Sequence, residues 1–138
     1  MTSPRASVDT SALLAAASPQ DQYHHDAVAI GRRFLAGGGR WLGTTLVLAE
    51  LHGHLLRRHG PAPARTVIRR LLGDPSYEWV EASPTLVRDA VTAWLERFHD
   101  QRFSLTDAVT FEVMRRERIS EAFAFDQDFV TAGFELLR

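Results

Sequence analysis

Short runs of apolar residues alternate along the chain with longer stretches in which apolar residues recur at helical spacing. Ala27, Ile30 and Phe34, for example, fall on one face of a helix. Tyr77 to Glu81 instead alternates in the aromatic-rich manner of a strand. The expected strands are residues 6–8, 40–43, 77–81, 121–125 and 134–137, the expected helices are residues 11–17, 23–36, 45–58, 61–72, 84–98 and 105–117, and a short turn or helix is expected at 126–132.

Residues typical of helix starts support two of these predicted helix boundaries. Ser83-Pro84 places proline at a first helical position, and Ser104 to Asp107 has the spacing of a capping box. Strands separated by helices predict parallel pairing through right-handed crossovers. We therefore expect an α/β fold, an α/β/α sandwich with a central, mainly parallel sheet of about five strands, in a single domain of residues 1–138. Arg5 to Val8 is less apolar than a buried parallel strand usually is.

The composition is that of an ordinary globular protein and excludes several classes. Apolar residues make up 45% and charged residues 24% of the 138 positions. The absence of cysteine excludes disulfides and cysteine metal sites. No apolar run approaches the roughly 20 residues of a membrane helix, and Met1 to Arg5 is unlike a signal peptide. A cytoplasmic protein without membrane association is expected.

Basic residues are distributed unevenly, although a net charge of −1 does not indicate a general nucleic-acid binder. All 16 are arginine, and the segment between Leu51 and Gly73 contains no acid. Its arginines are compatible with phosphate contacts and equally with solvated helix faces. They are Arg57, Arg58, Arg65, Arg69 and Arg70.

Four acids stand beside small or apolar neighbours: Asp9, Glu50, Asp107 and Asp126. Asp9 falls where a strand passes into a helix, at the edge of an α/β sheet where ligands bind. Partly buried carboxylates that lie close together take up protons unless a cation neutralises them. The natural partners are hard divalent ions with oxygen ligands, such as Mg²⁺ or Mn²⁺.

Each acid also has a simpler explanation. Asp9 could cap the following helix, and Asp107 could be the second member of its capping box. Glu50 could pair with a nearby arginine or histidine, and Asp126 could begin a turn. Singly, most of the four fit these structural roles, but together and in this order they favour a metal site.

The four acids and their neighbours resemble the motifs of the PIN-domain ribonucleases, especially the VapC toxins of type II toxin–antitoxin pairs. Val8 to Leu13 is similar to the opening motif, and Leu48 to Leu51 is similar to the glutamate helix. Ser104 to Ala108 and Phe125 to Phe129 resemble the third and fourth acidic motifs, and Ala132 to Phe134 follows near the end. The resemblance extends over nearly the whole chain.

This resemblance implies that the acids come from two adjacent strands and two helices to one pocket, where they hold one or two Mg²⁺ ions, with Mn²⁺ also possible. The implied catalytic and metal-binding acids are Asp9, Glu50, Asp107 and Asp126. Ser11 and Thr106 are implied as supporting hydroxyls, and Asp128 either as an additional acid near the metal or as a helix cap.

The implied function is a metal-dependent endoribonuclease that acts as a toxin, with water activated for attack on an RNA phosphodiester. The implied partners are the RNA substrate, a cognate antitoxin whose segment lies in an apolar groove, and a second copy in a homodimer. One alternative is a non-catalytic PIN-like module for nucleic-acid binding or assembly. Another is a metal phosphohydrolase that uses histidines such as His25 or His54. The two histidine pairs of the sequence, His24-His25 and His52-Gly53-His54, are expected to be structural or exposed.

Overall fold

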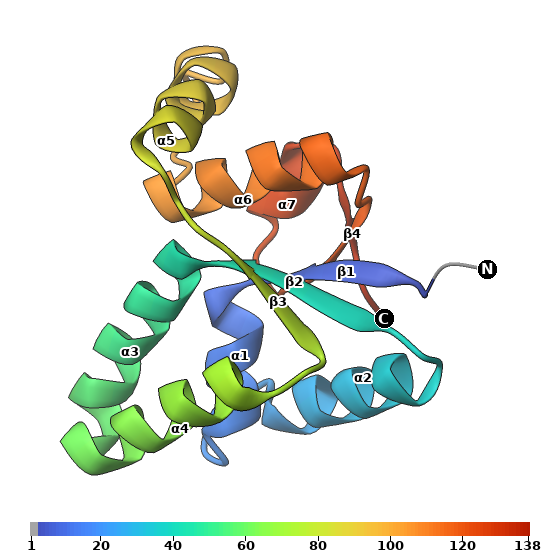
Figure 1. Ribbon diagram of the computed structural model, residues 1–138, viewed down its shortest axis with the longest axis vertical. Helices are drawn as coiled ribbons and strands as arrows, with labels where there is room; N and C mark the ends of the chain where they lie inside the picture. Colours follow the sequence, from blue (N-terminus) through green and yellow to red (C-terminus); the bar gives the residue numbers. More distant parts are fainter. Residues whose placement is uncertain (1–2) are drawn as a thin grey trace.

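A five-stranded, entirely parallel sheet forms the centre of the computed structural model, which describes residues 3–138. The strand order is β3-β2-β1-β4-β5, so β1 lies in the middle (Figure 1). The predicted α/β architecture is confirmed. The strands are β1 (Arg5–Val8), β2 (Arg40–Thr44), β3 (Tyr77–Val80), β4 (Glu121–Phe123) and β5 (Glu135–Leu136).

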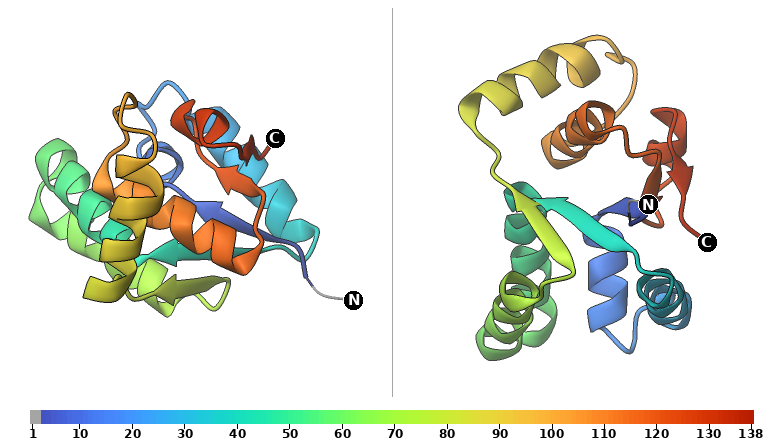
Figure 2. Two further views of the ribbon diagram at one scale, coloured as in Figure 1. Left: turned by 90° about the horizontal axis from the view of Figure 1, so that it is seen from above. Right: turned by 45° about the vertical axis from the view of Figure 1, so that its right-hand side comes forward.

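Helices cover both faces of the sheet, and each layer encloses its own hydrophobic core. Helices α1 to α4 lie on one face and α5 to α7 on the other, as the right-hand view of Figure 2 also shows. No helix within residues 3–138 combines the length and apolarity needed to cross a bilayer. The helices are α1 (Thr10–Ala17), α2 (His24–Ala36), α3 (Thr45–His59), α4 (Pro61–Gly73), α5 (Pro84–Ala90), the π-helix η1 (Val91–Glu96), α6 (Leu105–Glu117) and α7 (Asp128–Thr131).

The weakly apolar β1 is nevertheless the central strand. Ala6 and Val8 are fully buried against the α1–α4 layer, and these small side chains let the helices approach closely. Ser7 is also buried and donates a hydrogen bond to the sulfur of Met114, at 3.2 Å, on α6. Arg5 lies at the amino end of β1, is partly exposed, and pairs with Glu117 at 3.1 Å. The polar residues of β1 therefore have partners, which explains how it occupies a buried position.

Strand β4 is shorter than predicted, because it ends at Phe123 rather than Phe125. Its neighbour β1 ends at Val8, and the backbone N–H of Asp9 makes the last contact, donating to the Phe123 carbonyl at 3.0 Å. Beyond that point β1 passes into α1, so β4 has no strand left to pair with on the β1 side. Asp126 consequently lies in a loop three residues after β4, not at its end. The last strand is likewise limited to Glu135–Leu136.

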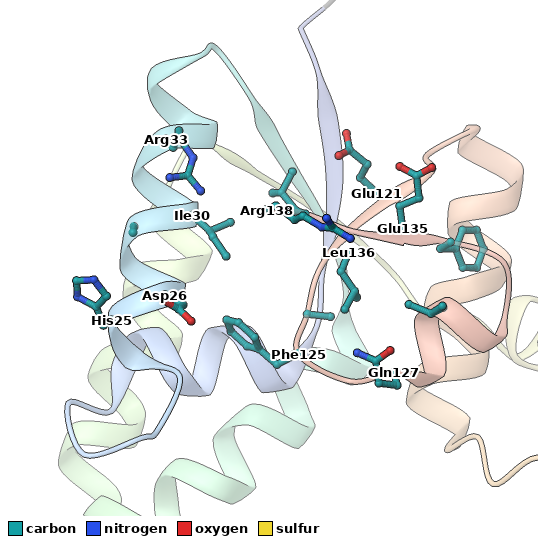
Figure 3. Close-up of a pocket in the computed structure, with 15 residues that line it drawn as sticks. His25, Asp26, Ile30, Arg33, Glu121, Phe125, Gln127, Glu135, Leu136 and Arg138 are labelled. Atoms are coloured by element: carbon teal, nitrogen blue, oxygen red, sulfur yellow. The ribbon is translucent and has the colours of Figure 1, made fainter.

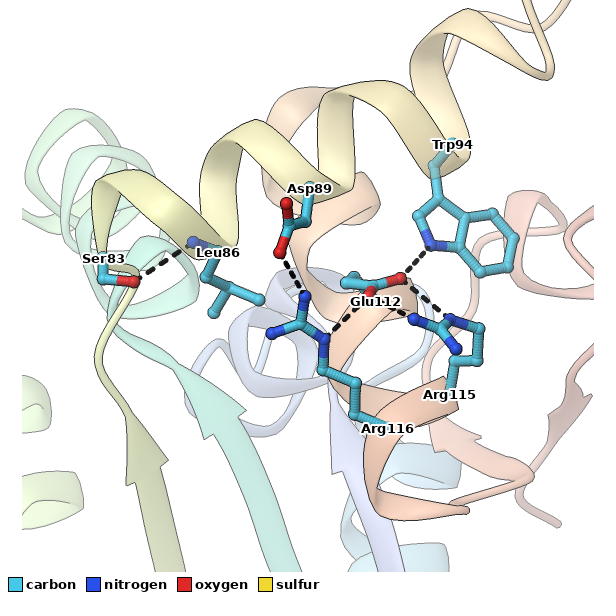
Figure 4. Close-up of polar contacts among 7 residues, drawn as sticks. All are labelled: Ser83, Leu86, Asp89, Trp94, Glu112, Arg115 and Arg116. Carbon is cyan, nitrogen blue, oxygen red and sulfur yellow. Dashed lines mark hydrogen bonds and ion pairs between the residues drawn. The ribbon is translucent and has the colours of Figure 1, made fainter.

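The predicted helix over residues 84–98 is an α-helix followed by the π-helix η1, and it packs on α6 around a buried acid (Figure 4). Glu112 is 1% exposed and accepts hydrogen bonds from Trp94 of η1 at 3.2 Å and from Arg115 at 2.6 Å. Arg116 donates to Glu112 at 2.7 Å and to Asp89 of α5 at 2.6 Å. Burial opposes the ionisation of Glu112, but these donors hold its pKa below the usual value. The cluster joins α5 and η1 to α6.

Candidate active site

The predicted acids line one cavity of about 460 Å³, next to the carboxyl ends of β1 and β4. Asp9 and Asp126 enter it from the segments that follow those strands, whereas Glu50 and Asp107 enter from α3 and α6. All four are therefore brought together, as the motif resemblance implied. The cavity is lined by Asp9, Thr10, Ser11, Leu14, Glu50, His54, Arg102, Ser104, Asp107, Asp126 and Asp128.

Asp9 is both a helix cap and a member of this acidic cavity. Its side chain accepts a hydrogen bond from the Ser11 backbone N–H at 3.2 Å, which caps α1. The Ser11 hydroxyl donates to the same carboxylate at 2.5 Å and accepts from the Phe125 backbone N–H at 3.1 Å. Ser11 therefore joins the Asp9 carboxylate to the loop that carries Asp126.

The alternative pairings considered for Glu50 and Asp107 do not occur within residues 3–138. Glu50 is half-buried without an ion pair there, and Arg57 instead lies 3.4 Å from His54. The Ser104 hydroxyl accepts from the Asp107 backbone N–H at 3.0 Å, but the reciprocal bond to the Asp107 carboxylate is absent. Both carboxylates remain available to the cavity.

Three carboxylates come closest to one another. One oxygen each from Asp107, Asp126 and Asp128 lie within 4.8 Å, which is suitable for a shared cation. Asp126 also accepts from the Asp128 backbone N–H at 2.9 Å, so it begins the turn into α7 as well. Asp128 is the first residue of α7, and Gln127 holds the cap position. From the sequence, Asp128 was given a lower rank than the four other acids. In the structure it belongs to the group of three carboxylates that lie closest together.

The hydroxyls of the cavity differ in part from those predicted. Thr106 is half-buried but is not among the residues that line the cavity. Thr10 lines it instead, is 4% exposed, and its hydroxyl has no hydrogen-bond partner within residues 3–138. A buried hydroxyl without a partner is costly and suggests that water or a ligand completes the site. Arg102 and His54 also line the cavity, and nothing in the sequence marked Arg102.

Several carboxyl groups of the cavity have raised pKa values, so they are harder to ionise than free ones. Burial raises the pKa of Asp9 to about 6, with smaller effects in the same direction from Asp126 and Glu50. Burial, followed by the charges of Asp9 and Asp126, raises the pKa of Asp107 to about 7. The pKa of Asp128 is raised by burial and by Asp126. Clustered oxygen donors that resist ionisation fit a hard divalent cation, which would stabilise all of them in the charged form.

This arrangement predicts that stability without metal depends on pH. Because the folded-state pKa values of Asp9 and Asp107 lie above their usual 3.8, their stabilising contribution is complete below pH 3.8 and is lost as the pH rises through about 6 and 7. The Tm of chelator-treated protein should fall by about 5 °C between about pH 5 and pH 8. Mg²⁺ or Mn²⁺ should restore it near pH 8 and have little effect near pH 5. A Tm rise on adding metal that is equal at both pH values would contradict this assignment.

The fold is that of a PIN domain. The chain belongs to the PIN-domain family, whose sequence model matches residues 6–135. The crystal structure of Mycobacterium tuberculosis VapC20, described as a Sarcin-Ricin loop cleaving toxin, aligns with a TM-score of 0.81 and 30% identity. That alignment covers 93% of this chain and 95% of VapC20. The structure of FitAcB from Neisseria gonorrhoeae shares the fold, with a TM-score of 0.66, 12% identity and coverage of 96% of both chains.

A sequence comparison finds the same relative over a shorter segment. The 23S rRNA-specific endonuclease VapC20 of Mycobacterium tuberculosis strain H37Rv is 47% identical over 45 residues. This segment is 33% of the present chain and 34% of VapC20, so it spans about a third of the curated relative. The family expected from the acidic motifs is confirmed.

Proposed function

We propose that this protein is a metal-dependent endoribonuclease that hydrolyses RNA phosphodiester bonds and acts as the toxin of a toxin–antitoxin pair. The observation that carries the proposal is the convergence of five carboxylates on one cavity: Asp9, Glu50, Asp107, Asp126 and Asp128. The likeness to VapC20, named as a 23S rRNA-specific endonuclease and a toxin, supports both the chemistry and RNA as the substrate class.

Asp107, Asp126 and Asp128 are best placed to hold a divalent cation, Mg²⁺ or alternatively Mn²⁺, with Asp9 completing the acidic set. Such a cation supplies charge neutralisation at the scissile phosphate and lowers the pKa of water. Ser11 fixes the orientation of Asp9 through its 2.5 Å hydrogen bond.

Two further residues of the cavity have roles in this proposal. Glu50 is half-buried and lies outside the closest group of carboxylates, so it can accept the proton of the attacking water. Arg102 brings a guanidinium to the same cavity, where it can donate hydrogen bonds to a phosphate oxygen.

Cleavage mapping tests the proposed activity. Purified protein incubated with total bacterial RNA and intact ribosomes in Mg²⁺ should produce discrete cuts with 5′-phosphate and 3′-hydroxyl ends. Excess chelator should abolish cleavage, and added Mg²⁺ or Mn²⁺ should restore it, because the carboxylates cannot neutralise the phosphate themselves. RNA binding without cleavage under any of these conditions would instead favour the non-catalytic module.

The phosphohydrolase that uses histidines has less support. His25 lines a separate groove between α2 and the C-terminal strands (Figure 3), so it does not reach the cavity that His54 lines. His24 contacts the Ala15 carbonyl at 2.8 Å and connects α2 to α1, which is a structural role. His25→Ala should therefore leave cleavage unchanged.

The antitoxin and the homodimer are also proposals. An antitoxin segment that inhibits the enzyme needs an apolar groove and a basic side chain to enter the acidic cavity. Leu56 and Leu72, which are 42% and 60% exposed, line one groove on α3 and α4. The groove of Figure 3, with Ile30, Phe125 and Leu136, is a second surface of this character. A cytoplasmic location follows if ribosomal RNA is the substrate.

A further inference from the structure

A column of aromatic rings leads from the core to the surface beside the acidic cavity. Trp41 stacks on Phe123 with ring centroids 4.9 Å apart, and Phe123 meets Phe125 at 6.4 Å. Phe125 stacks on Tyr23 at 4.6 Å with the two rings within 5° of parallel. Trp41 and Phe123 are buried, whereas Tyr23 is 40% exposed. Tyr23 is therefore the outer end of a supported, flat aromatic stack.

The outer two rings are fixed relative to the candidate catalytic acids. The Phe125 backbone N–H donates to the Ser11 hydroxyl, which itself donates to the Asp9 carboxylate. The Tyr23 backbone N–H donates to an oxygen of Asp21 at 2.9 Å. The position of the stack is thus coupled to Asp9 through one shared hydroxyl.

A second cavity, of about 430 Å³, connects the stack to the acidic site. Tyr23 and Phe125 line it together with Arg58 of α3. Ser11 and Asp126 line both this cavity and the acidic one, so the two are contiguous. A polymer bound at the acids has a direct path to the aromatic stack.

Arg58 adds a positive charge at this second cavity. Its Nη1 atom lies 3.3 Å from a carboxylate oxygen of Asp21, and its side chain remains 47% exposed. The remaining guanidinium N–H groups are available to phosphate. Glu50, His54 and Arg58 are spaced four residues apart on α3, so one helix face extends from the acidic cavity to the second cavity.

We propose that Tyr23, backed by Phe125, and Arg58 form a nucleotide subsite next to the scissile phosphate. The Tyr23 ring stacks on the base of the adjoining nucleotide, and Arg58 contacts the backbone phosphate. Aromatic rings that stack on bases, beside an arginine that contacts the backbone, hold single-stranded nucleic acid in this way, with little preference for base identity. The subsite therefore determines how well RNA is positioned rather than which base is chosen. It rests on the proposed ribonuclease function.

Two variants of Tyr23 test the need for a flat ring. On an RNA oligonucleotide that contains the mapped cleavage site, Tyr23→Leu should lower kcat/KM by about tenfold or more, mainly through a higher KM. Tyr23→Phe should stay within about twofold of wild type, because the stacking face is retained. The Tm of each variant with and without Mg²⁺ verifies that the fold and acidic cavity are intact.

A binding measurement keeps the test independent of cleavage. With 2-aminopurine next to the cleavage position, fluorescence should be quenched by wild type and Tyr23→Phe but not by Tyr23→Leu. Arg58→Gln should weaken binding and reduce its salt dependence by about one phosphate contact. The matched control Arg32→Gln, an exposed arginine of α2, should leave both unchanged.

The outcomes separate this subsite from the ribonuclease function. Wild-type cleavage with unchanged kinetics and quenching in Tyr23→Leu would overturn the subsite and leave the ribonuclease standing. Loss of antitoxin binding in Tyr23→Leu with unchanged RNA kinetics would also overturn it, because the stack would then be a protein-docking surface. If wild type cleaves no RNA, the proposed function fails, and the effect of Arg58→Gln on the binding of a single-stranded RNA and on its salt dependence still tests whether RNA occupies the subsite.

Discussion

Replacement of Asp9 with asparagine should lower the rate of RNA cleavage by about a thousandfold or more, without unfolding the protein. Asparagine has nearly the same shape but no charge, so the cavity loses one carboxylate next to Asp126 and Glu50. If the proposed function holds, metal affinity should fall, and with it the neutralisation of the phosphate. The measurement is a single-turnover cleavage rate at saturating Mg²⁺.

The fold should tolerate this change because asparagine is also a good helix cap. Its side-chain oxygen can accept the hydrogen bond that Asp9 now receives from the Ser11 backbone N–H. One negative charge is also removed from beside Asp107, whose pKa is raised in part by Asp9. The metal-free Tm of Asp9→Asn should therefore equal or exceed that of wild type, while the Tm increase on adding Mg²⁺ should be smaller.

Glu96→Gln is the matched control, since it removes an exposed carboxylate of η1 that does not line the acidic cavity. Its cleavage rate and its response to Mg²⁺ should be those of wild type. An Asp9→Asn enzyme that cleaves within about tenfold of wild type would contradict the assignment of Asp9 as a metal-site acid.

The sequence predicted the sheet and four of the cavity acids because their signals are local. Asp9 follows an extended segment, and Asp107 follows a helix start, so each could be assigned to an element end. The convergence of the four could not be derived from their spacing alone, because it depends on the strand order that places β1 next to β4. The resemblance to PIN-domain motifs supplied that information.

Other members of the cavity depend on loop geometry, which leaves little trace in sequence. Arg102 precedes α6 in an irregular segment, and Asp128 reaches the acids only because the chain turns at Asp126. The only feature of the sequence that could have indicated Thr10 as a cavity residue is its position directly after Asp9. Of the two predicted hydroxyls, Ser11 lines the cavity and Thr106 does not.

Glu112 was missed for a different reason. With Arg115 and Arg116 three and four residues later, it has the spacing of an ordinary ion pair on a solvent-exposed helix face. Only the packing of η1 against α6 buries it and adds the Trp94 contact. Burial changes its importance, because a buried carboxylate with several donors is costly to remove.

Replacement of Glu112 with alanine should destabilise the protein by about 2–4 kcal/mol, measured as the free energy of unfolding in urea at pH 7. The change leaves the Trp94 indole N–H without its acceptor and opens a cavity between η1 and α6. Arg115 and Arg116 have side chains that are 60% and 41% exposed, so water can solvate them and limit the loss.

Two further variants isolate the role of burial and charge. Glu117→Gln, on the same helix, breaks the ion pair with Arg5 but neutralises a carboxylate whose side chain is 43% exposed, so it should cost less than about 1 kcal/mol. Glu112→Gln should cost about 1–2 kcal/mol, since its amide oxygen can still accept from Trp94. Equal losses for Glu112→Ala and Glu117→Gln would show that the buried cluster does not stabilise the fold.

The pH dependence of Glu112→Gln gives the sign of the charge contribution. Because the native pKa of Glu112 lies below its usual 4.5, the carboxylate stabilises the fold fully above pH 4.5, and this contribution is lost as the pH falls through the lower native value. The stability difference between wild type and Glu112→Gln should therefore be constant near neutral pH and shrink in acid. This window lies below most of the one expected for Asp9 and Asp107, whose contributions are lost between pH 3.8 and about pH 6 and 7. A pH titration of unfolding without metal should therefore show two changes of opposite sign, a gain in stability as the pH rises in acid and a loss towards neutral pH, and Glu112→Gln should remove only the gain.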